Sequence, residues 1–487
     1  MNKTIRRASV FCLLLVLALL VRATWVQFYD GRALADNKNN RRNVMEQYAY
    51  PLGDIIVGGE AVTGSKRTGD GSDLAYKRTY KDGDLYAGVT GFSSQVYGQT
   101  QLEGIYQDIL DGTDTRLKNP VDAVTGKHTE PGDVVTTIDP SVQKAAYRAL
   151  GDKKGAAVAI DPKTGKVLGL VSTPSFDPSK ISGSDSSTDG KAWTALSKDK
   201  DQPTLNRAIK QALPPGSTFK LVVAAAALED GLYSSVDAKT DSPNPFRLPG
   251  TSTDLKNESA SAPCEDASIR TALQYSCNNV FGKIAVDLGQ DKVRAMAEKF
   301  GFNDAEQDMP VRASQSVYPK DMDKAQTGLS GIGQFDVTAT PLQMAMVSAT
   351  IANGGRQASP HMVSQVTDAD GNAIKSFADG DDTRVVSSST ASQLQSAMQT
   401  VVEQGTGTNA QIAGATVGGK TGTAQHGENN SKTPYAWFTS YAKDDSTGKE
   451  VAVAVVVEQS DAARSEVSGN GLAAPIAKAM MSAALKD

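Results

Sequence analysis

The sequence predicts an α+β fold, in which a mainly antiparallel sheet lies between helical layers. Two β-rich runs meet at a turn between residues 155 and 172, and three further β-rich runs cover 415–423, 436–441 and 451–458. Apolar helical patterns lie between these two groups of strands and after the second group. Strands at both ends of a segment with central helices are typical of this class.

The composition is that of a globular protein with room for two or three domains. The chain has 487 residues, of which 39% are apolar and 22% are charged. Its net charge of −5 gives no basic surface for nucleic acid. The three histidines, His128, His361 and His426, lie far apart. We therefore expect neither a metal site nor a cofactor.

The N-terminus predicts a membrane anchor over residues 1–30. Three basic residues among the first seven precede an apolar stretch from Ala8 to Val21. Continued to Phe28, with Arg22 reaching outward, this stretch would form roughly 31 Å of helix, enough to cross a bilayer. A cleaved signal peptide is the alternative, although no small residues are well placed for cleavage. In both cases the basic end stays inside and the rest is exported.

The exported part is expected to divide into two units, over residues 31–150 and 151–487. Residues 29–50 are polar and predict a stalk next to the membrane. The remaining predicted elements, in chain order, are a helix over 102–110 ended by Gly112, a strand at 133–138, a helix over 140–150 capped by Asp139, the hairpin at 155–172, a polar surface loop at 182–202 and a closing helix over 471–485.

Three short motifs in the second half of the chain carry reactive side chains. They are Ser217-Thr218-Phe219-Lys220, Ser276-Cys277-Asn278 and Lys420-Thr421-Gly422. The first follows Pro214-Pro215-Gly216 and opens an apolar, Ala-rich run. That context predicts a sharp turn into a buried helix, with Lys220 one turn after Ser217.

Further copies of these motifs occur in less suitable settings. Ser197 to Lys200 lies in a polar segment with no predicted helix, and Ser440 to Lys443 closes a predicted strand, where such a pair points to opposite faces. Lys163 to Gly165 lies in a predicted hairpin turn. The context therefore favours the set that begins at Ser217.

The three motifs resemble the SxxK, SxN and KTG set of penicillin-binding proteins and serine β-lactamases. The resemblance covers nearly the whole chain and is strongest to class B penicillin-binding proteins of the actinobacterial penicillin-binding protein A type. Beyond the motifs, it rests on TTIDPSVQKAA, AIDPKTGKVLGLVSTPSFDP, LNRAIKQALPPGSTFK and ATPLQMAMVSATIANGG. Two departures are Pro51-Leu52-Gly53, where many relatives have Arg-Gly, and Phe335, where a glycine is common.

The resemblance implies a transpeptidase domain on an N-terminal pedestal that resembles a dimerisation domain. It further implies a peptidoglycan D,D-transpeptidase that cross-links stem peptides through an acyl-serine intermediate and is inhibited by penicillin and other β-lactams. The implied partners are a lipid-embedded glycan polymerase or divisome proteins. The protein would cross the cell membrane once, with a cytoplasmic N-terminus and an extracellular catalytic domain. A D,D-carboxypeptidase, a β-lactamase and a β-lactam-binding sensor remain alternatives.

The chemistry expected of these residues follows from a serine that needs a base. With no histidine near the motif, Lys220 is the available base for Ser217, and burial together with Lys420 would lower the pKa of its amine. Ser276 would relay the proton to the leaving amine, and Asn278 would hydrogen-bond Lys220 and the substrate amide.

The third motif is expected to bind the substrate. Lys420 and Thr421 would bind its carboxylate, and Gly422 would leave room for a peptide to pair along the strand. The backbone N–H groups of Ser217 and Thr423 would stabilise the oxyanion.

Two cysteines outside the apolar N-terminal stretch, Cys264 and Cys277, form a possible disulfide. Cys12 lies inside that stretch. An exported domain permits a disulfide, and two free buried thiols are the alternative.

Overall fold

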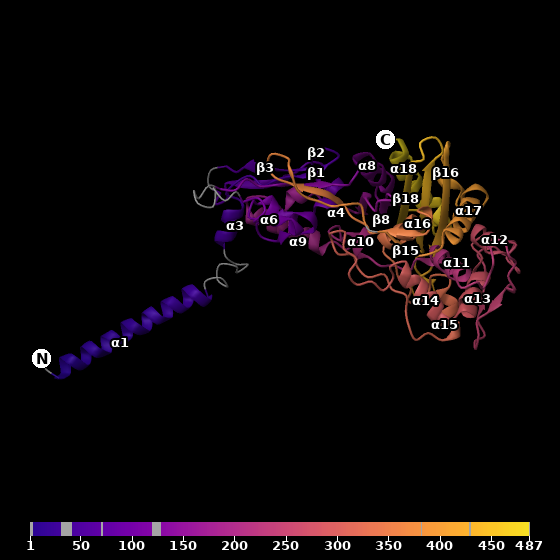
Figure 1. Cartoon of the computed structure of the whole chain (residues 1–487), viewed down its shortest axis with the longest axis horizontal. Coiled ribbons are helices and arrows are strands. Elements are labelled where there is room, and N and C mark those ends of the chain that lie inside the picture. Colours follow the sequence, from indigo (N-terminus) through magenta and orange to yellow (C-terminus); the bar gives the residue numbers. More distant parts are fainter. Residues whose placement is uncertain are drawn as a thin grey trace.

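The computed structural model describes residues 3–30, 41–69, 72–118, 128–380, 382–427 and 430–486. Helix α1 (Lys3–Trp25) and the turn η1 (Val26–Asp30) extend away from the rest of the chain (Figure 1). The segment Lys3–Tyr29 is the one helix of the described residues that is long and apolar enough to cross a membrane. This finding is consistent with the predicted anchor.

The predicted polar stalk at 29–50 is partly wrong. Residues 31–40 lie outside the described residues, but 41–47 form the helix α3 (Arg41–Gln47). The segment after α3 is anchored, because Tyr48 is buried with Leu52 and Leu74 and is hydrogen-bonded through its hydroxyl to Ser93 Oγ at 2.7 Å.

The pedestal is built on a five-stranded sheet with the order β14-β13-β7-β1-β2. Strands β1 (Ile55–Val57) and β7 (Asp133–Thr136) pair in parallel, while all other pairs in this sheet are antiparallel. Two of its strands, β13 (Val363–Thr367) and β14 (Ala373–Ser376), come from far later in the chain and appear as an orange ribbon among the indigo strands in Figure 1. The fifth strand is β2 (Glu60–Ala61).

The predicted helix over 102–110 is divided in two. Helix α5 (Gln101–Ile105) ends at Tyr106, and α6 (Gln107–Leu110) follows at once. Leu102, Ile109 and Leu110 are buried as the periodicity requires. The other elements of the pedestal are β3 (Thr63–Arg67), β4 (Tyr76–Tyr80), α4 (Gly83–Thr90), β5 (Ser93–Ser94) and β6 (Gly98–Gln99).

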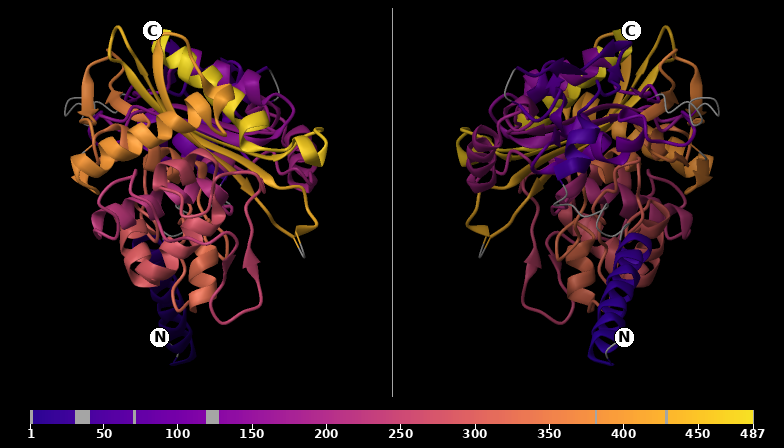
Figure 2. Two further views of the ribbon diagram at one scale, coloured as in Figure 1. Left: turned by 90° about the vertical axis from the view of Figure 1, so that its right-hand side faces the viewer. Right: turned by 90° about the vertical axis from the view of Figure 1, so that its left-hand side faces the viewer.

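The catalytic domain has an antiparallel sheet with the order β16-β17-β18-β8-β9. Its strands are β8 (Lys154–Ile160), β9 (Val167–Thr173), β16 (Ala415–Ala424), β17 (Tyr435–Asp444) and β18 (Glu450–Gln459). The predicted hairpin and all three late strands are therefore confirmed. Helices α8 (Pro140–Leu150) and α18 (Ala474–Lys486) share one core with this sheet, and the magenta and orange helices lie below it in the left view of Figure 2.

The helical layer below the sheet carries the first two motifs, and the third lies on β16. The two most buried helices are α11 (Lys220–Glu229), which follows the 3-10 turn η3 (Gly216–Phe219), and α16 (Pro341–Ala352). The remaining elements of the domain are η2 (Pro178–Lys180), α10 (Arg207–Lys210), β10 (Phe246–Arg247), β11 (Asp254–Leu255), α12 (Ile269–Gln274), α13 (Asn278–Leu288), α14 (Gln290–Lys299), α15 (Lys324–Ser330), β12 (Arg356–Ala358), β15 (Asp382–Arg384), α17 (Ser388–Gln404), η4 (Thr408–Ala410), η6 (Arg464–Glu466) and η7 (Gly469–Ala473).

The prediction of a surface loop at 182–202 is wrong, because this segment contains the helix α9 (Ser186–Lys198). The Asp185 side chain caps this helix by accepting a hydrogen bond from Ser187 N at 2.9 Å. Trp193 then packs on the pedestal, with its ring 4.8 Å from that of Tyr97. Ser197 of the second SxxK copy lies in the last turn of α9 and is exposed. It therefore lacks the buried setting of Ser217.

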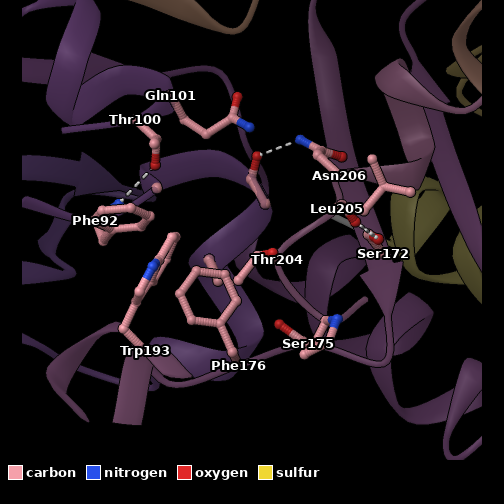
Figure 3. Close-up of a pocket in the computed structure, with 14 residues that line it drawn as sticks. Phe92, Thr100, Gln101, Ser172, Ser175, Phe176, Trp193, Thr204, Leu205 and Asn206 are labelled. Carbon is pink, nitrogen blue, oxygen red and sulfur yellow. Dashed lines mark hydrogen bonds between the residues drawn. The ribbon is translucent and has the colours of Figure 1, made fainter. Parts of the chain in front are cut away.

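A cavity of about 200 Å³ lies where the pedestal meets the catalytic domain (Figure 3). The aromatic rings of Phe92, Phe176 and Trp193 line one side of it. On another side Asn206 Nδ2 donates a hydrogen bond of 2.8 Å to Gly88 O and so joins the two domains. None of the three motifs lines this cavity.

Candidate active site

The serine of the first motif lies in the 3-10 turn η3, which leads directly into α11. Gly216, with φ of 53°, turns the chain into this position, and its N–H donates to Gly333 O at 3.1 Å. A Cβ on Gly333 would lie 2.1 Å from Gly216 O, so only glycine fits there. Ser217 is 7% exposed, whereas Lys220 is fully buried.

The second motif lies in the turn between α12 and α13. Ser276 has φ of 58°, a left-handed conformation that is strained for a residue other than glycine. Cys277 precedes α13 as its N-cap residue and is joined by a disulfide to Cys264, with both side chains buried. Asn278 opens the helix. Strain that the surrounding structure holds in place is typical of functional sites.

The two lysines of the motifs meet at Ser276 Oγ. Lys220 Nζ lies 3.2 Å from this hydroxyl oxygen and Lys420 Nζ lies 3.0 Å from it. Lys220 Nζ also donates to Asn278 Oδ1 and to Ser276 O, both at 2.8 Å. Among the described residues, none of the hydrogen bonds of Lys220 Nζ reaches Ser217 Oγ. Lys220 follows Ser217 at the expected spacing, but its amine points to the second motif.

Burial makes both lysines weak cations. It lowers the pKa of Lys220 well below its usual range, and the nearby charge of Lys420 lowers it further. Burial also lowers the pKa of Lys420 to about 7. The negative charge of Glu258 opposes both shifts. The lowered pKa of Lys220 favours the neutral amine that a general base requires.

The third motif lies on β16, the outermost strand of its sheet. Lys420 Nζ donates to Thr421 O at 2.9 Å, and Thr421 Oγ1 lies 2.8 Å from Thr406 Oγ1. A Cβ on Gly422 would lie 2.9 Å from Pro215 O. Gly422 thus lets β16 pack on the turn that holds Ser217. The sequence analysis had explained this glycine only by the room it leaves for a substrate peptide.

A groove of about 570 Å³ passes over the serine. Ser217, Asn278 and Thr423 line it, so residues of all three motif regions meet at one surface. Its other described lining residues are Leu255, Lys256, Asn257, Glu258, Leu329, Ile332, Gln334, Phe335, Gln425 and Asn430.

Two residues of this groove were missed by the sequence analysis. Asn257 Oδ1 accepts hydrogen bonds from the backbone N–H groups of Asn278 at 2.6 Å and Asn279 at 3.3 Å, and so caps α13 from a separate segment. Glu258 follows it. No local pattern identifies either residue, because their roles depend on where the segment after β11 docks.

Phe335, noted as a departure from the family pattern, also lines the groove. Its φ of 52° lies in the left-handed region, which favours glycine. The side chain packs partly against the core. The position thus keeps the backbone conformation of a glycine while it carries an aromatic ring.

No metal centre is evident in this part of the chain. Within the described ranges, no group of three or more His, Cys, Asp or Glu residues is placed to hold a metal ion.

Comparison with known proteins identifies two matching families. Residues 155–482 match the penicillin binding protein transpeptidase domain, and residues 52–134 match the penicillin binding protein A dimerisation domain. The chain is 37% identical to the peptidoglycan D,D-transpeptidase PbpA of Mycolicibacterium smegmatis, over 100% of both chains. It is also 37% identical to PbpA of Mycobacterium tuberculosis, over 100% of this chain and 99% of the relative.

The fold is shared with solved structures. Penicillin-binding protein A from M. tuberculosis, in a ceftriaxone acyl-enzyme complex, superposes with a TM-score of 0.83 and 37% identity, over 91% of this chain and 100% of that chain. The penicillin G acyl-enzyme complex of the same protein gives a TM-score of 0.81 and 37% identity, over 89% of this chain and 99% of that chain.

Proposed function

Because the chain belongs to the penicillin-binding protein transpeptidase family, we propose that it is a peptidoglycan D,D-transpeptidase that penicillin inhibits. The observation that carries this proposal is the pair of buried lysines on Ser276 beneath a groove lined by Ser217. A serine nucleophile beside a neutral amine is suited to acyl transfer through a covalent intermediate.

In the first half-reaction, Lys220 takes the proton of Ser217 as its oxygen attacks the carbonyl carbon between the two D-Ala residues of a stem peptide. The backbone N–H groups of Ser217 and Thr423 stabilise the oxyanion. Ser276 passes the proton to the nitrogen of the leaving D-Ala, because it contacts both lysines. Asn278 holds Lys220 and the substrate amide.

The substrate enters along β16. An outermost strand can pair with an extended peptide, and Gly422 and Thr423 lie on that strand beside the Ser217 turn. Lys420 and Thr421 bind the terminal carboxylate of the peptide. The contact between Thr421 Oγ1 and Thr406 Oγ1 supports this role by orienting the Thr421 hydroxyl.

In the second half-reaction, an amine of a neighbouring stem peptide takes the acyl group and forms the cross-link. A D,D-carboxypeptidase, which uses water as the acceptor, is the nearest alternative. The proposal of a transpeptidase is supported by the full-length similarity to proteins that carry that name.

We propose that this chemistry takes place at the outer side of the cell membrane. We assign residues 1–30 to an uncleaved anchor with a cytoplasmic N-terminus, 31–150 to the pedestal and 151–487 to the extracellular catalytic domain, apart from β13 and β14, which lie in the pedestal sheet. The apolar helix and the dimerisation-domain match support this division. Since β13 and β14 complete the pedestal sheet, a chain that begins near Gly155 would leave them without β7. The pedestal is a suitable docking region for a lipid-embedded glycan polymerase or divisome proteins.

Mass spectrometry of the intact protein after penicillin treatment tests the proposal. We expect one covalent adduct, which localises to the peptide that contains Ser217. The Ser217→Ala variant should take up none. An adduct on that variant would refute the assignment of the nucleophile. Release of cross-linked dimers from stem-peptide substrates, rather than of shortened monomers alone, distinguishes a transpeptidase from a carboxypeptidase.

A further inference from the structure

The groove over Ser217 has two walls of different character. One is the outermost strand β16, which carries Thr423. The other includes the segment 255–258, which follows β11. If the donor peptide pairs with β16, the segment 255–258 remains for a second ligand.

Glu258 is the sole carboxylate among the described residues that line this groove. The described ion pairs within 4 Å do not include it, and its side chain is exposed. Its charge nevertheless reaches the reactive centre, since it raises the pKa of both Lys220 and Lys420 against the effect of burial. An unpaired negative charge therefore faces the site of acyl transfer.

The backbone beside Glu258 is fixed to the second motif. Asn257 caps α13, and Asn278 Nδ2 donates to Lys256 O at 2.9 Å. The Glu258 carboxylate is thus carried by a backbone segment that hydrogen bonds fix to Asn278. Such support from neighbouring hydrogen bonds is what a binding group needs to be positioned.

We infer that Glu258 binds the ammonium group of the acceptor stem peptide and so favours a primary amine over water as the acceptor. This inference rests on the proposed transpeptidase function. A primary amine in solution is protonated at neutral pH, and the two lysines of the site repel it to the extent that they are charged. A carboxylate on the groove wall offsets that repulsion and brings the amine beside the acyl-serine.

The transfer itself balances without any further reactant. The bound ammonium group first gives one proton to solvent. The neutral amine nitrogen then attacks the acyl carbon, the bond from that carbon to Ser217 Oγ breaks, and the second proton of the amine passes to Oγ. The products are the cross-linking amide and free Ser217. Glu258 takes no part in bond breaking, so it is a binding residue rather than a base.

The test compares aminolysis with hydrolysis in the whole protein in detergent. The donor is a stem-peptide thioester and the acceptor is Nα-acetyl-L-lysine amide, which offers one primary amine. At a pH on the plateau of the acylation profile, we expect Glu258→Gln to raise the KM for the acceptor about tenfold, a larger change than any in kcat at saturating acceptor, in hydrolysis of the donor or in penicillin acylation. Glu258→Asp should recover part of the acceptor affinity. Glu265→Gln, which alters an exposed glutamate outside the groove, is the matched control.

The other outcomes are separable. An unchanged acceptor KM in Glu258→Gln overturns the inference. This holds even if the low-pH side of the pH–rate profile of acylation shifts in that variant. Equal effects in Glu265→Gln also overturn it, because they would reflect general surface charge. If the unaltered protein forms no acyl-enzyme, or transfers nothing to the amine, the proposed function itself fails.

Discussion

Buried cations occur in both domains of this protein, and they meet different partners. In the pedestal, Arg78 is fully buried and its Nε donates to Glu103 Oε1 at 2.7 Å, while the remaining nitrogens donate to Gly53 O and Thr63 Oγ1. In the catalytic domain, Lys220 and Lys420 are equally buried but contact a hydroxyl, an amide oxygen and backbone carbonyls.

This difference in partners decides the charge. Burial by itself lowers the pKa of Arg78, but the charge of Glu103 raises it above its usual range. The two lysines lack a carboxylate in contact, so burial lowers the pKa of each. A buried cation paired with a carboxylate keeps its charge, whereas burial of a lysine without a carboxylate in contact favours the neutral amine, which can accept a proton.

The largest effect is expected from Lys220→Met. Removing the amine should slow acylation by penicillin about a thousandfold, because the serine loses its base. The free energy of unfolding should fall only modestly, because removing a buried amine offsets part of the loss of its hydrogen bonds to Ser276 O and Asn278 Oδ1. Stopped-flow acylation and chemical denaturation measure the two quantities. Lys81→Met, at an exposed lysine paired with Glu60, is the control. A strongly destabilised Lys220→Met with normal acylation would contradict the comparison.

Arg78→Met is expected to show the reverse pattern. It leaves Glu103, which is 1% exposed, without its partner, and should reduce the free energy of unfolding by about 3 to 5 kcal/mol. Acylation per folded molecule should not change. The double variant Arg78→Met, Glu103→Leu should recover much of the lost stability, because the fully buried carboxylate is removed with its partner, and the second carboxylate near Arg78, that of Asp54 at 3.6 Å, is partly exposed. If Arg78→Met slows acylation of the folded protein, the two buried sites are not separate.

Removal of the disulfide has the next largest expected effect. The bond spans a sequence separation of 13 residues, so Cys264→Ser with Cys277→Ser should reduce stability by about 3 kcal/mol. Acylation should slow modestly, because Ser276 would be held less firmly at its left-handed φ. Denaturation with and without reductant checks this. Reductant should destabilise the unaltered protein and leave the double variant unchanged. Equal free energies of unfolding for the unaltered protein and the double variant would show that the disulfide does not stabilise the fold.

The sheet of the catalytic domain could be predicted from the sequence because its signal is local. Continuous apolar runs such as 451–458 and the turn at 161–166 identify strands without knowledge of their partners. The pedestal sheet could not be predicted in this way. Strand β13 pairs with β7 across more than 200 residues, and β1 pairs with β7 in parallel. Helix α9 was missed because its Ser- and Asp-rich sequence becomes helical through a cap and the packing of Trp193.

The active site likewise combines features that the local sequence predicts with features that only the fold determines. The three motifs identify which side chains are reactive, since each lies on an element that its own neighbours specify. The direction in which the Lys220 side chain points is not determined by its neighbours in the sequence. Its amine turns to Ser276 and Asn278 because α13 begins there, and the start of α13 is fixed by Asn257. Asn257 and Glu258 come from a segment with no strong pattern, and only the fold brings them to the groove.

The smallest effect concerns pH and tests the coupling between the two lysines. Acylation requires neutral Lys220, so its rate falls as the pH drops through the pKa of this residue in the folded protein. The charge of Lys420 lowers that pKa, and Lys420→Met removes it. The pKa of Lys220 should then rise, and the acid limb of the normalised rate profile should move to higher pH.

The shift should be modest because burial is the main cause of the low pKa of Lys220, and Lys420→Met leaves that burial in place. Glu258→Gln provides a control of opposite sign, since removing a negative charge should lower the pKa of Lys220 and move the limb to lower pH. Acylation rates measured from pH 5 to 9 separate these shifts from changes in maximal rate. If both variants move the limb in the same direction, neighbouring charges do not set the pKa of the base, and the contrast with Arg78 loses its electrostatic basis.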